Sequence, residues 1–93
     1  MTAQLRLYTR KDCGLCDEMK AAVGAIAESV ALRLEEIDVD SAAELQEKYG
    51  NEVPVLFING RKAFKYRCTA RELRKRLSRE VGRRWLFGKA ASS

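Results

Sequence analysis

Hydrophobic and polar residues follow one another along this chain with the spacings of strands and helices. Residues 4–8 (QLRLY) alternate and are rich in strand-forming types, so they predict a first strand. Apolar residues then recur at spacings of 4, 3 and 4 positions, which is the pattern of one helix face. They are Met19, Val23, Ile26 and Val30. We therefore expect a helix over about residues 13–29.

A second strand and a short helix follow. Residues 32–39 (LRLEEIDV) predict a strand, with one slip in the apolar alternation near its middle. The run Ser41-Ala42-Ala43-Glu44 has the form of a capping box, in which the first and last side chains bond each other's backbone N–H groups. We expect it to open a helix that continues to about Tyr49. Gly50 should end that helix, because glycine is the residue most often found just past a helix.

The remaining pattern predicts a hairpin and a last helix. Residues 53–58 (VPVLFI) form a continuous apolar run, as in a buried central strand. Asn59-Gly60 is a strong signal for a two-residue hairpin turn, and the charged residues 61–66 suit an edge strand. A second capping box, from Thr69 to Glu72, opens the last helix, which should end at Gly82. Its inner face would consist of Ala70, Leu73, Leu77 and Val81.

These elements have the order β-α-β-α-β-β-α. The first two strands are joined through a helix and should be parallel with a right-handed crossover, whereas the hairpin strands should be antiparallel. The sequence thus predicts an α/β fold with one four-stranded mixed sheet flanked by three helices. Its 93 residues have the size of a single domain. We expect that domain to span residues 1–82 and to be followed by a C-terminal tail at 83–93.

Charge is distributed unevenly along the chain. Residues 1–60 carry 6 basic and 11 acidic groups, whereas residues 61–93 carry 12 basic and 2 acidic groups. Such a basic region raises the possibility of nucleic acid or an acidic partner. Apolar residues interrupt it at helical spacing, so most of its arginines and lysines should form the wet face of the last helix. We therefore do not expect nucleic acid to be a partner.

The sequence predicts neither a membrane span nor a secretory signal peptide. No apolar run approaches the roughly 20 residues that a membrane span needs, and the first residues, MTAQLRLYTR, contain no apolar signal-peptide core. We expect a cytoplasmic protein without membrane contact.

Cys13 and Cys16 stand three positions apart, where the first strand gives way to a helix. Three uses of such a pair compete: a metal site, a structural disulfide and a redox-active dithiol. A structural zinc site needs four Cys or His ligands, and the chain offers only one further cysteine, Cys68, and no histidine. An odd number of cysteines in a reducing cytosol argues against a structural disulfide. The redox-active dithiol is the favoured interpretation.

Position assigns a role to each thiol. A sulfur at a helix N-terminus meets the positive end of the helix dipole and unpaired N–H groups, which favour the nucleophilic thiolate. Cys13 is so placed, and Arg10 and Lys11 should act in the same direction, against the negative charge of Asp12. Cys16 lies one turn further in, on the same helix face. We expect Cys13 to attack a substrate disulfide and Cys16 to resolve the mixed disulfide that results.

Two motifs complete a resemblance to the thioredoxin fold and, more closely, to the glutaredoxins. Tyr8-Thr9 leads into Cys13-Gly14-Leu15-Cys16, and Val53-Pro54 precedes the run LFING at 56–60. The resemblance covers roughly residues 4–80. It implies a cis Val53–Pro54 bond whose neighbouring backbone pairs with the bound substrate or with glutathione. It also implies a thiol–disulfide oxidoreductase that reduces disulfides in cell redox homeostasis.

What the resemblance implies about partners is equally specific. It implies no bound cofactor, and glutathione or another thiol reductant, such as a thioredoxin-reductase-type system, as the electron donor. The partner would be a disulfide-containing protein or a glutathione mixed disulfide, and we expect a monomer. The residues expected to bind substrate or glutathione are Tyr8, Lys11, Leu15, Val53, Pro54 and Arg67.

Several of these assignments have alternatives. Tyr8 could pack in the core at the end of its strand, and Lys11 and Arg67 could be ordinary solvated charges. The Gly-Gly pair that glutaredoxins place before the last helix is absent, and Lys65-Tyr66-Arg67-Cys68 stands in that region. Cys68 would be either a small buried hydrophobe or a third redox thiol.

Two other functions remain open on the sequence alone. A dimer could bridge an iron–sulfur cluster through Cys13 of each chain and two outside thiols. Alternatively, the fold could serve as a non-catalytic scaffold that binds an acidic partner through its last helix.

Overall fold

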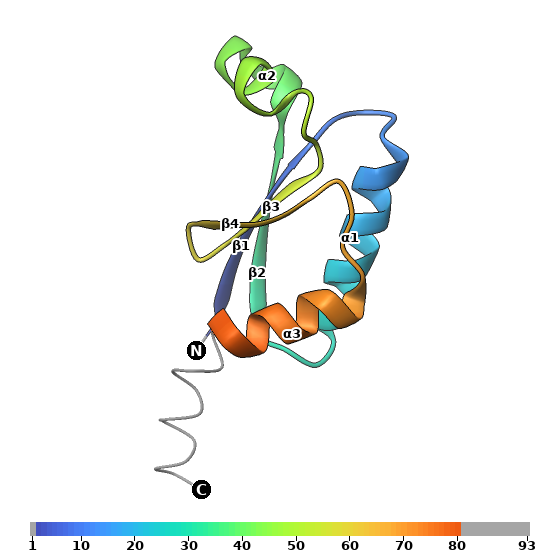
Figure 1. The fold of residues 1–93 in the computed structure, drawn as a ribbon, viewed down its shortest axis with the longest axis vertical. Helices are drawn as coiled ribbons and strands as arrows, with labels where there is room; N and C mark the ends of the chain where they lie inside the picture. The colour runs from blue at the N-terminus through green and yellow to red at the C-terminus, as the bar shows by residue number, and fades with distance from the viewer. Residues whose placement is uncertain (1, 81–93) are drawn as a thin grey trace, which may run out of the picture.

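A computed structural model describes residues 2–80, which fold as an α/β domain with a four-stranded mixed sheet and three α-helices (Figure 1). The order of strands and α-helices is the predicted one, with a short 3₁₀ helix, η1, added after the second strand. The elements are β1 Ala3–Thr9, α1 Gly14–Ala27, β2 Leu32–Asp38, η1 Val39–Ser41, α2 Ala43–Tyr49, β3 Val55–Ile58, β4 Arg61–Lys65 and α3 Ala70–Glu80.

The sheet has the strand order β2-β1-β3-β4. As predicted, β1 runs parallel to β2, and β3 and β4 form an antiparallel hairpin; β1 and β3 are also antiparallel. At the hairpin turn Asn59 and Gly60 have φ angles of 50° and 85°. Positive φ at both central residues is what a type I′ turn requires, which explains why this dipeptide marks the turn so strongly.

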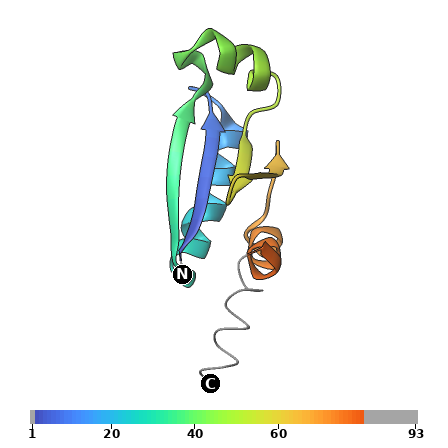
Figure 2. The ribbon, with the colours of Figure 1, turned by 90° about the vertical axis from the view of Figure 1, so that its left-hand side faces the viewer.

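Helices α1 and α3 cover one face of the sheet, and α2 lies beyond the end of the sheet (Figures 1 and 2). Side chains alternate along β1, so Leu5 and Leu7 enter the core beneath α1 and α3. Tyr8 belongs instead to a second cluster, which includes Tyr49 and Val55 on the opposite face. In the described part of the chain, α2 is the α-helix that contributes to this second cluster, through Leu45 and Tyr49.

The main core joins the two covering helices to the sheet. Met19 and Ile26 of α1 meet Leu73 and Leu77 of α3 there, and each is at most 3% exposed. Burying a side chain of this size is worth about 1.5–3 kcal/mol, so this cluster holds α1 in place on the sheet. The inner face predicted for the last helix is confirmed for Leu73 and Leu77, and Ala70 packs at its edge.

One of the two predicted capping boxes is present. At α3 the Thr69 N–H donates to Glu72 Oε1 at 3.0 Å, and the Glu72 N–H donates to Thr69 Oγ1 at 3.1 Å. The box predicted at Ser41 is wrong, because η1 occupies Val39–Ser41 and makes Ala42 the N-cap of α2, without a side-chain cap. The Ser41 hydroxyl instead donates to the Asp38 carbonyl at 2.6 Å.

Gly50 does end α2, but for a reason other than left-handed backbone. Its φ and ψ are −54° and −32°, in the right-handed region. A Cβ there would overlap the carbonyl oxygen of Gln46 and lie 3.3 Å from the guanidinium of Arg10. The glycine therefore permits the close approach of its backbone to the Gln46 carbonyl, which accepts the Gly50 N–H at 2.8 Å, and the Gly50 carbonyl in turn accepts from Arg10 at 3.2 Å.

Some predictions concern residues that the structure does not describe. Val81, Gly82 and the tail predicted at 83–93 lie outside residues 2–80, so the domain boundary at residue 82 stays a prediction. Within residues 2–80, no helix combines the length and the apolar composition that crossing a membrane would require.

The asymmetry between the two predicted boxes can be tested by matched substitutions. Glu72→Ala should lower the free energy of unfolding by about 1 kcal/mol, because the Thr69 N–H loses its acceptor. Glu44→Ala removes a first-turn carboxylate that makes no such bond, and should cost only about 0.3 kcal/mol through the helix dipole. Urea unfolding measures both. Equal losses would contradict the assignment of the caps.

Candidate active site

The sulfur of Cys13 caps the first helix. Cys13 has extended backbone angles, φ −114° and ψ 105°, and its Sγ accepts the backbone N–H of Cys16 at 3.2 Å. The preceding residue, Asp12, has φ 53°, and this sharp turn brings the chain into the helix. The N-cap side chain is thus a cysteine, whose sulfur takes the place usually occupied by a hydroxyl or carboxylate oxygen.

Cys13 and Cys16 are joined by a disulfide within the first turn of α1, with their Cα atoms 5.2 Å apart. Cys13 is half-buried, whereas Cys16 is only 2% exposed. The structure therefore brings the two predicted thiols together, with the first one open to solvent and the second one shielded. In this arrangement Cys13 can contact another molecule, whereas Cys16 can react only with Cys13.

An ion pair between Arg10 and Asp40, which the sequence did not predict, holds the loop before Cys13 in place. Arg10 makes two hydrogen bonds to Asp40 in η1, Nε to Oδ2 and Nη2 to Oδ1, each 3.0 Å long. The Asp40 carboxylate also accepts from Gln46 Nε2 at 3.1 Å. The hydrogen bond from Arg10 lowers the pKa of the Asp40 carboxyl, and the same contact raises the pKa of Arg10. Asp40 thus balances much of the Arg10 charge that was expected to act on Cys13.

Two other segments lie at the end of the sheet where β1 leads into the loop before Cys13. Tyr8 of β1 pairs with Val55, so Pro54 lies beside Thr9 at that end. The Val53–Pro54 peptide bond is cis, as the resemblance implied. Val55 also pairs with Lys65, and the N–H of Tyr66 donates to the Pro54 carbonyl at 2.9 Å. The loop after β4 therefore borders the same edge.

The other predicted binding residues fall into two groups. Lys11 and Arg67 are exposed, and Leu15, the second residue of α1, is half-buried. All three belong to segments at the Cys13 end of the sheet. Val53 is half-buried and packs against the aromatic cluster on the sheet's second face. Outside the helices and strands, none of the backbone hydrogen bonds among residues 2–80 involves Val53. Its backbone N–H and carbonyl can therefore pair with an extended ligand.

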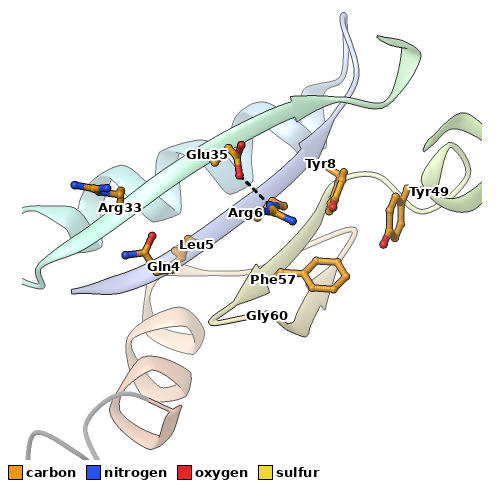
Figure 3. Close-up of a pocket in the computed structure, with 9 residues that line it drawn as sticks. All are labelled: Gln4, Leu5, Arg6, Tyr8, Arg33, Glu35, Tyr49, Phe57 and Gly60. Carbon is orange, nitrogen blue, oxygen red and sulfur yellow. Dashed lines mark hydrogen bonds and ion pairs between the residues drawn. The ribbon is translucent and has the colours of Figure 1, made fainter. Parts of the chain in front are cut away.

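Tyr8 is placed away from the cysteines, in the packed position that was its alternative interpretation. It is 8% exposed, and its ring stacks on Tyr49 with centroids 4.3 Å apart. Tyr8 borders an open hollow of about 470 Å³ on the second face of the sheet, together with Phe57 and the Arg6–Glu35 ion pair (Figure 3). Neither Cys13 nor Pro54 lines this hollow, so we do not assign it to the dithiol site.

Cys68 is buried in the main core and is 8% exposed. Burial raises the pKa of its thiol to about 11, and the charge of Glu72 adds to the effect. Its Sγ contacts the Thr69 carbonyl oxygen at 3.3 Å. These features match the interpretation of Cys68 as a small buried hydrophobe, because a neutral thiol is a poor nucleophile. Within residues 2–80, no group of three or more Cys, Asp or Glu side chains is arranged to hold a metal ion.

Comparison with known proteins agrees with this geometry. Residues 4–78 match the model of the glutaredoxin-like domain (DUF836). The chain is similar to the structural genomics target protein XcR50 from X. campestris, with 37% identity over 80% of this chain and 95% of that one, at a TM-score of 0.67. It is also similar to protein Ne2328 from Nitrosomonas europaea, with 28% identity over 78% and 88% of the two chains and a TM-score of 0.67.

A thioredoxin gives the same fold at a greater distance. A mutant thioredoxin from Halobacterium salinarum is 26% identical over 82% of this chain and 72% of that one, with a TM-score of 0.60. The thioredoxin-like fold expected from the sequence is therefore confirmed.

The burial of Cys68 has a consequence for stability. In the unfolded chain its thiol ionises near the ordinary pKa of 9.0, whereas in the folded protein it stays neutral until about pH 11. Its contribution to stability is thus present below pH 9 and is lost as the pH rises toward 11. The free energy of unfolding of the oxidised protein should fall over this range relative to that of Cys68→Ala. Parallel pH profiles for the two proteins would show that Cys68 ionises as freely as in the unfolded chain.

Proposed function

Because the chain belongs to the glutaredoxin-like domain family, we propose that it is a thiol–disulfide oxidoreductase that reduces disulfides with the Cys13–Cys16 dithiol. The observation that carries this proposal is the capping contact of Cys13, whose sulfur, in the disulfide form, accepts the Cys16 N–H at the start of α1. An N–H donor and the helix dipole both stabilise a thiolate more than a thiol. The accessible sulfur is therefore the better nucleophile of the pair.

The reaction proceeds in two exchanges that conserve atoms and electrons. The Cys13 thiolate attacks one sulfur of the substrate disulfide, forms a mixed disulfide and releases the other sulfur as a thiolate, which takes up a proton. Cys16 then loses its proton and attacks the Cys13 sulfur, which closes the Cys13–Cys16 disulfide and releases the second substrate thiolate for protonation. The substrate gains two electrons and two protons. Both electrons come from the two cysteines, one proton comes from Cys16, and the other is the proton that Cys13 released to solvent on ionising.

The edge formed by Val53 and Pro54 would hold the substrate for this attack. Val53 takes part in none of the backbone hydrogen bonds found outside the helices and strands of residues 2–80. Its backbone could therefore pair with an extended substrate segment, which would add to the sheet as a further strand. Lys11 is exposed beside the dithiol, whereas the charge of Arg10 is balanced by Asp40, so Lys11 is the better placed to attract an acidic group on the substrate.

A thiol donor must return the disulfide to the dithiol after each turnover. Glutathione or a thioredoxin-reductase-type system would supply the two electrons, and no bound cofactor is needed. The substrate would be a disulfide-containing protein or a glutathione mixed disulfide. The reaction fits a monomer in the reducing cytoplasm, where the dithiol form is maintained.

Single substitutions separate the roles of the three cysteines. Cys13→Ser should abolish the reduction of a protein disulfide, since the attacking sulfur is gone. Cys16→Ser should instead accumulate a mixed disulfide on Cys13, visible as an added mass that a reductant removes. Cys68→Ala serves as the control and should retain at least about half of the activity, because Cys68 is buried and neutral. Full activity of Cys13→Ser would rule the proposal out.

A further inference from the structure

Tyr66 is an aromatic residue whose side chain is exposed to solvent. Among residues 2–80 it is the only exposed large hydrophobic residue, at 43%. Its backbone N–H donates to the Pro54 carbonyl at 2.9 Å, and its hydroxyl donates to the Asn51 carbonyl at 3.3 Å. The ammonium of Lys65 lies 5.4 Å from the centre of the ring. The ring is therefore fixed at both ends and is still partly accessible to a ligand.

The backbone of Tyr66 is also unusual. Its φ angle is 70°, in the left-handed region that glycine adopts freely and that a side chain with a Cβ disfavours. A glycine would satisfy this position at no steric cost. Strained backbone of this kind persists only where the surrounding structure maintains it. It is concentrated at ligand-binding and catalytic sites.

The two hydrogen bonds fix where the ring lies. They attach its backbone end to Pro54 and its hydroxyl end to Asn51, so the ring runs alongside residues 51–54. Val53 lies between these two anchors, and its backbone takes part in none of the hydrogen bonds found outside the helices and strands of residues 2–80. A substrate segment that pairs with Val53 must therefore pass beside the ring of Tyr66.

We infer that Tyr66 determines substrate specificity: its ring forms one wall of the docking edge and selects peptide disulfides with an apolar or aromatic side chain next to the half-cystine. This inference rests on the function proposed above and names the substrate class of that site. A neighbouring apolar side chain would cover the exposed ring and remove it from water. Glutathione disulfide has no apolar side chain to place there, so it gains nothing from Tyr66.

Two model peptides test this inference directly. Each contains one intermolecular disulfide, and they differ only in whether phenylalanine or glycine precedes the half-cystine. Wild-type protein should reduce the phenylalanine peptide with a kcat/KM about tenfold higher, the low end of what one apolar contact provides. Tyr66→Gly should reduce both peptides with nearly the kcat/KM that the wild-type protein has for the glycine peptide.

Tyr66→Phe is the matched control. It keeps the ring and loses only the hydroxyl bond to Asn51, so it should retain most of the preference for the phenylalanine peptide. Tyr66→Gly should still unfold cooperatively in urea with a midpoint close to that of wild type, because relief of the left-handed backbone offsets the lost hydroxyl bond to Asn51. A loss of preference in that variant is then a loss of the ring and not of the fold.

The outcomes distinguish this inference from the proposed function. If wild type reduces both peptides equally, or if Tyr66→Gly keeps the preference, the role of Tyr66 is overturned while the reductase activity stands. If wild type reduces neither peptide although Cys13 and Cys16 are reduced, the proposed function is overturned, and the inference with it.

Discussion

The first turn of α1 is the feature on which this account of the protein depends. The helix starts with an N–H group that needs an acceptor, and the chain provides the sulfur of Cys13 for it. The sulfur is thereby fixed in position while it remains partly open to solvent. Met19, Val23 and Ile26 anchor the same helix in the core and so position it on the sheet. The packing of α1 in the core thus also determines where the reactive sulfur lies.

The sheet register gathers the other parts of the site around this point. Antiparallel pairing of β1 with β3, and of β3 with β4, brings the segments around Cys13, Pro54 and Tyr66 to one end of the sheet. The contacts of Arg10 with Asp40 and Gly50 join the loop before Cys13 to the α2 side of that end. The opposite face of the sheet carries an aromatic cluster, against which Val53 packs, and a hollow that neither Cys13 nor Pro54 lines.

Local patterns predicted the fold and the pair of thiols, whereas contacts between distant residues escaped them. Asn59-Gly60 and the box at Thr69 involve neighbours in sequence, so the sequence alone was sufficient. The box predicted at Ser41 failed because a 3₁₀ turn moved the helix start by one residue. The Arg10–Asp40 pair spans 30 positions, and no local signal marks it. The left-handed backbone of Tyr66 was equally hidden, since it accompanies a hydrogen bond to the distant Pro54.

The claim that the helix start activates Cys13 can be tested most directly by titrating that thiol. The reduced Cys16→Ser protein keeps the backbone N–H at position 16, and the burial of Cys68 separates its ionisation from that of Cys13. Ultraviolet absorbance of the thiolate then gives the pKa of Cys13. Stabilisation of the thiolate by the helix start predicts a value below the roughly 8.5 of a free cysteine. A folded protein whose Cys13 titrates at or above that value would contradict it.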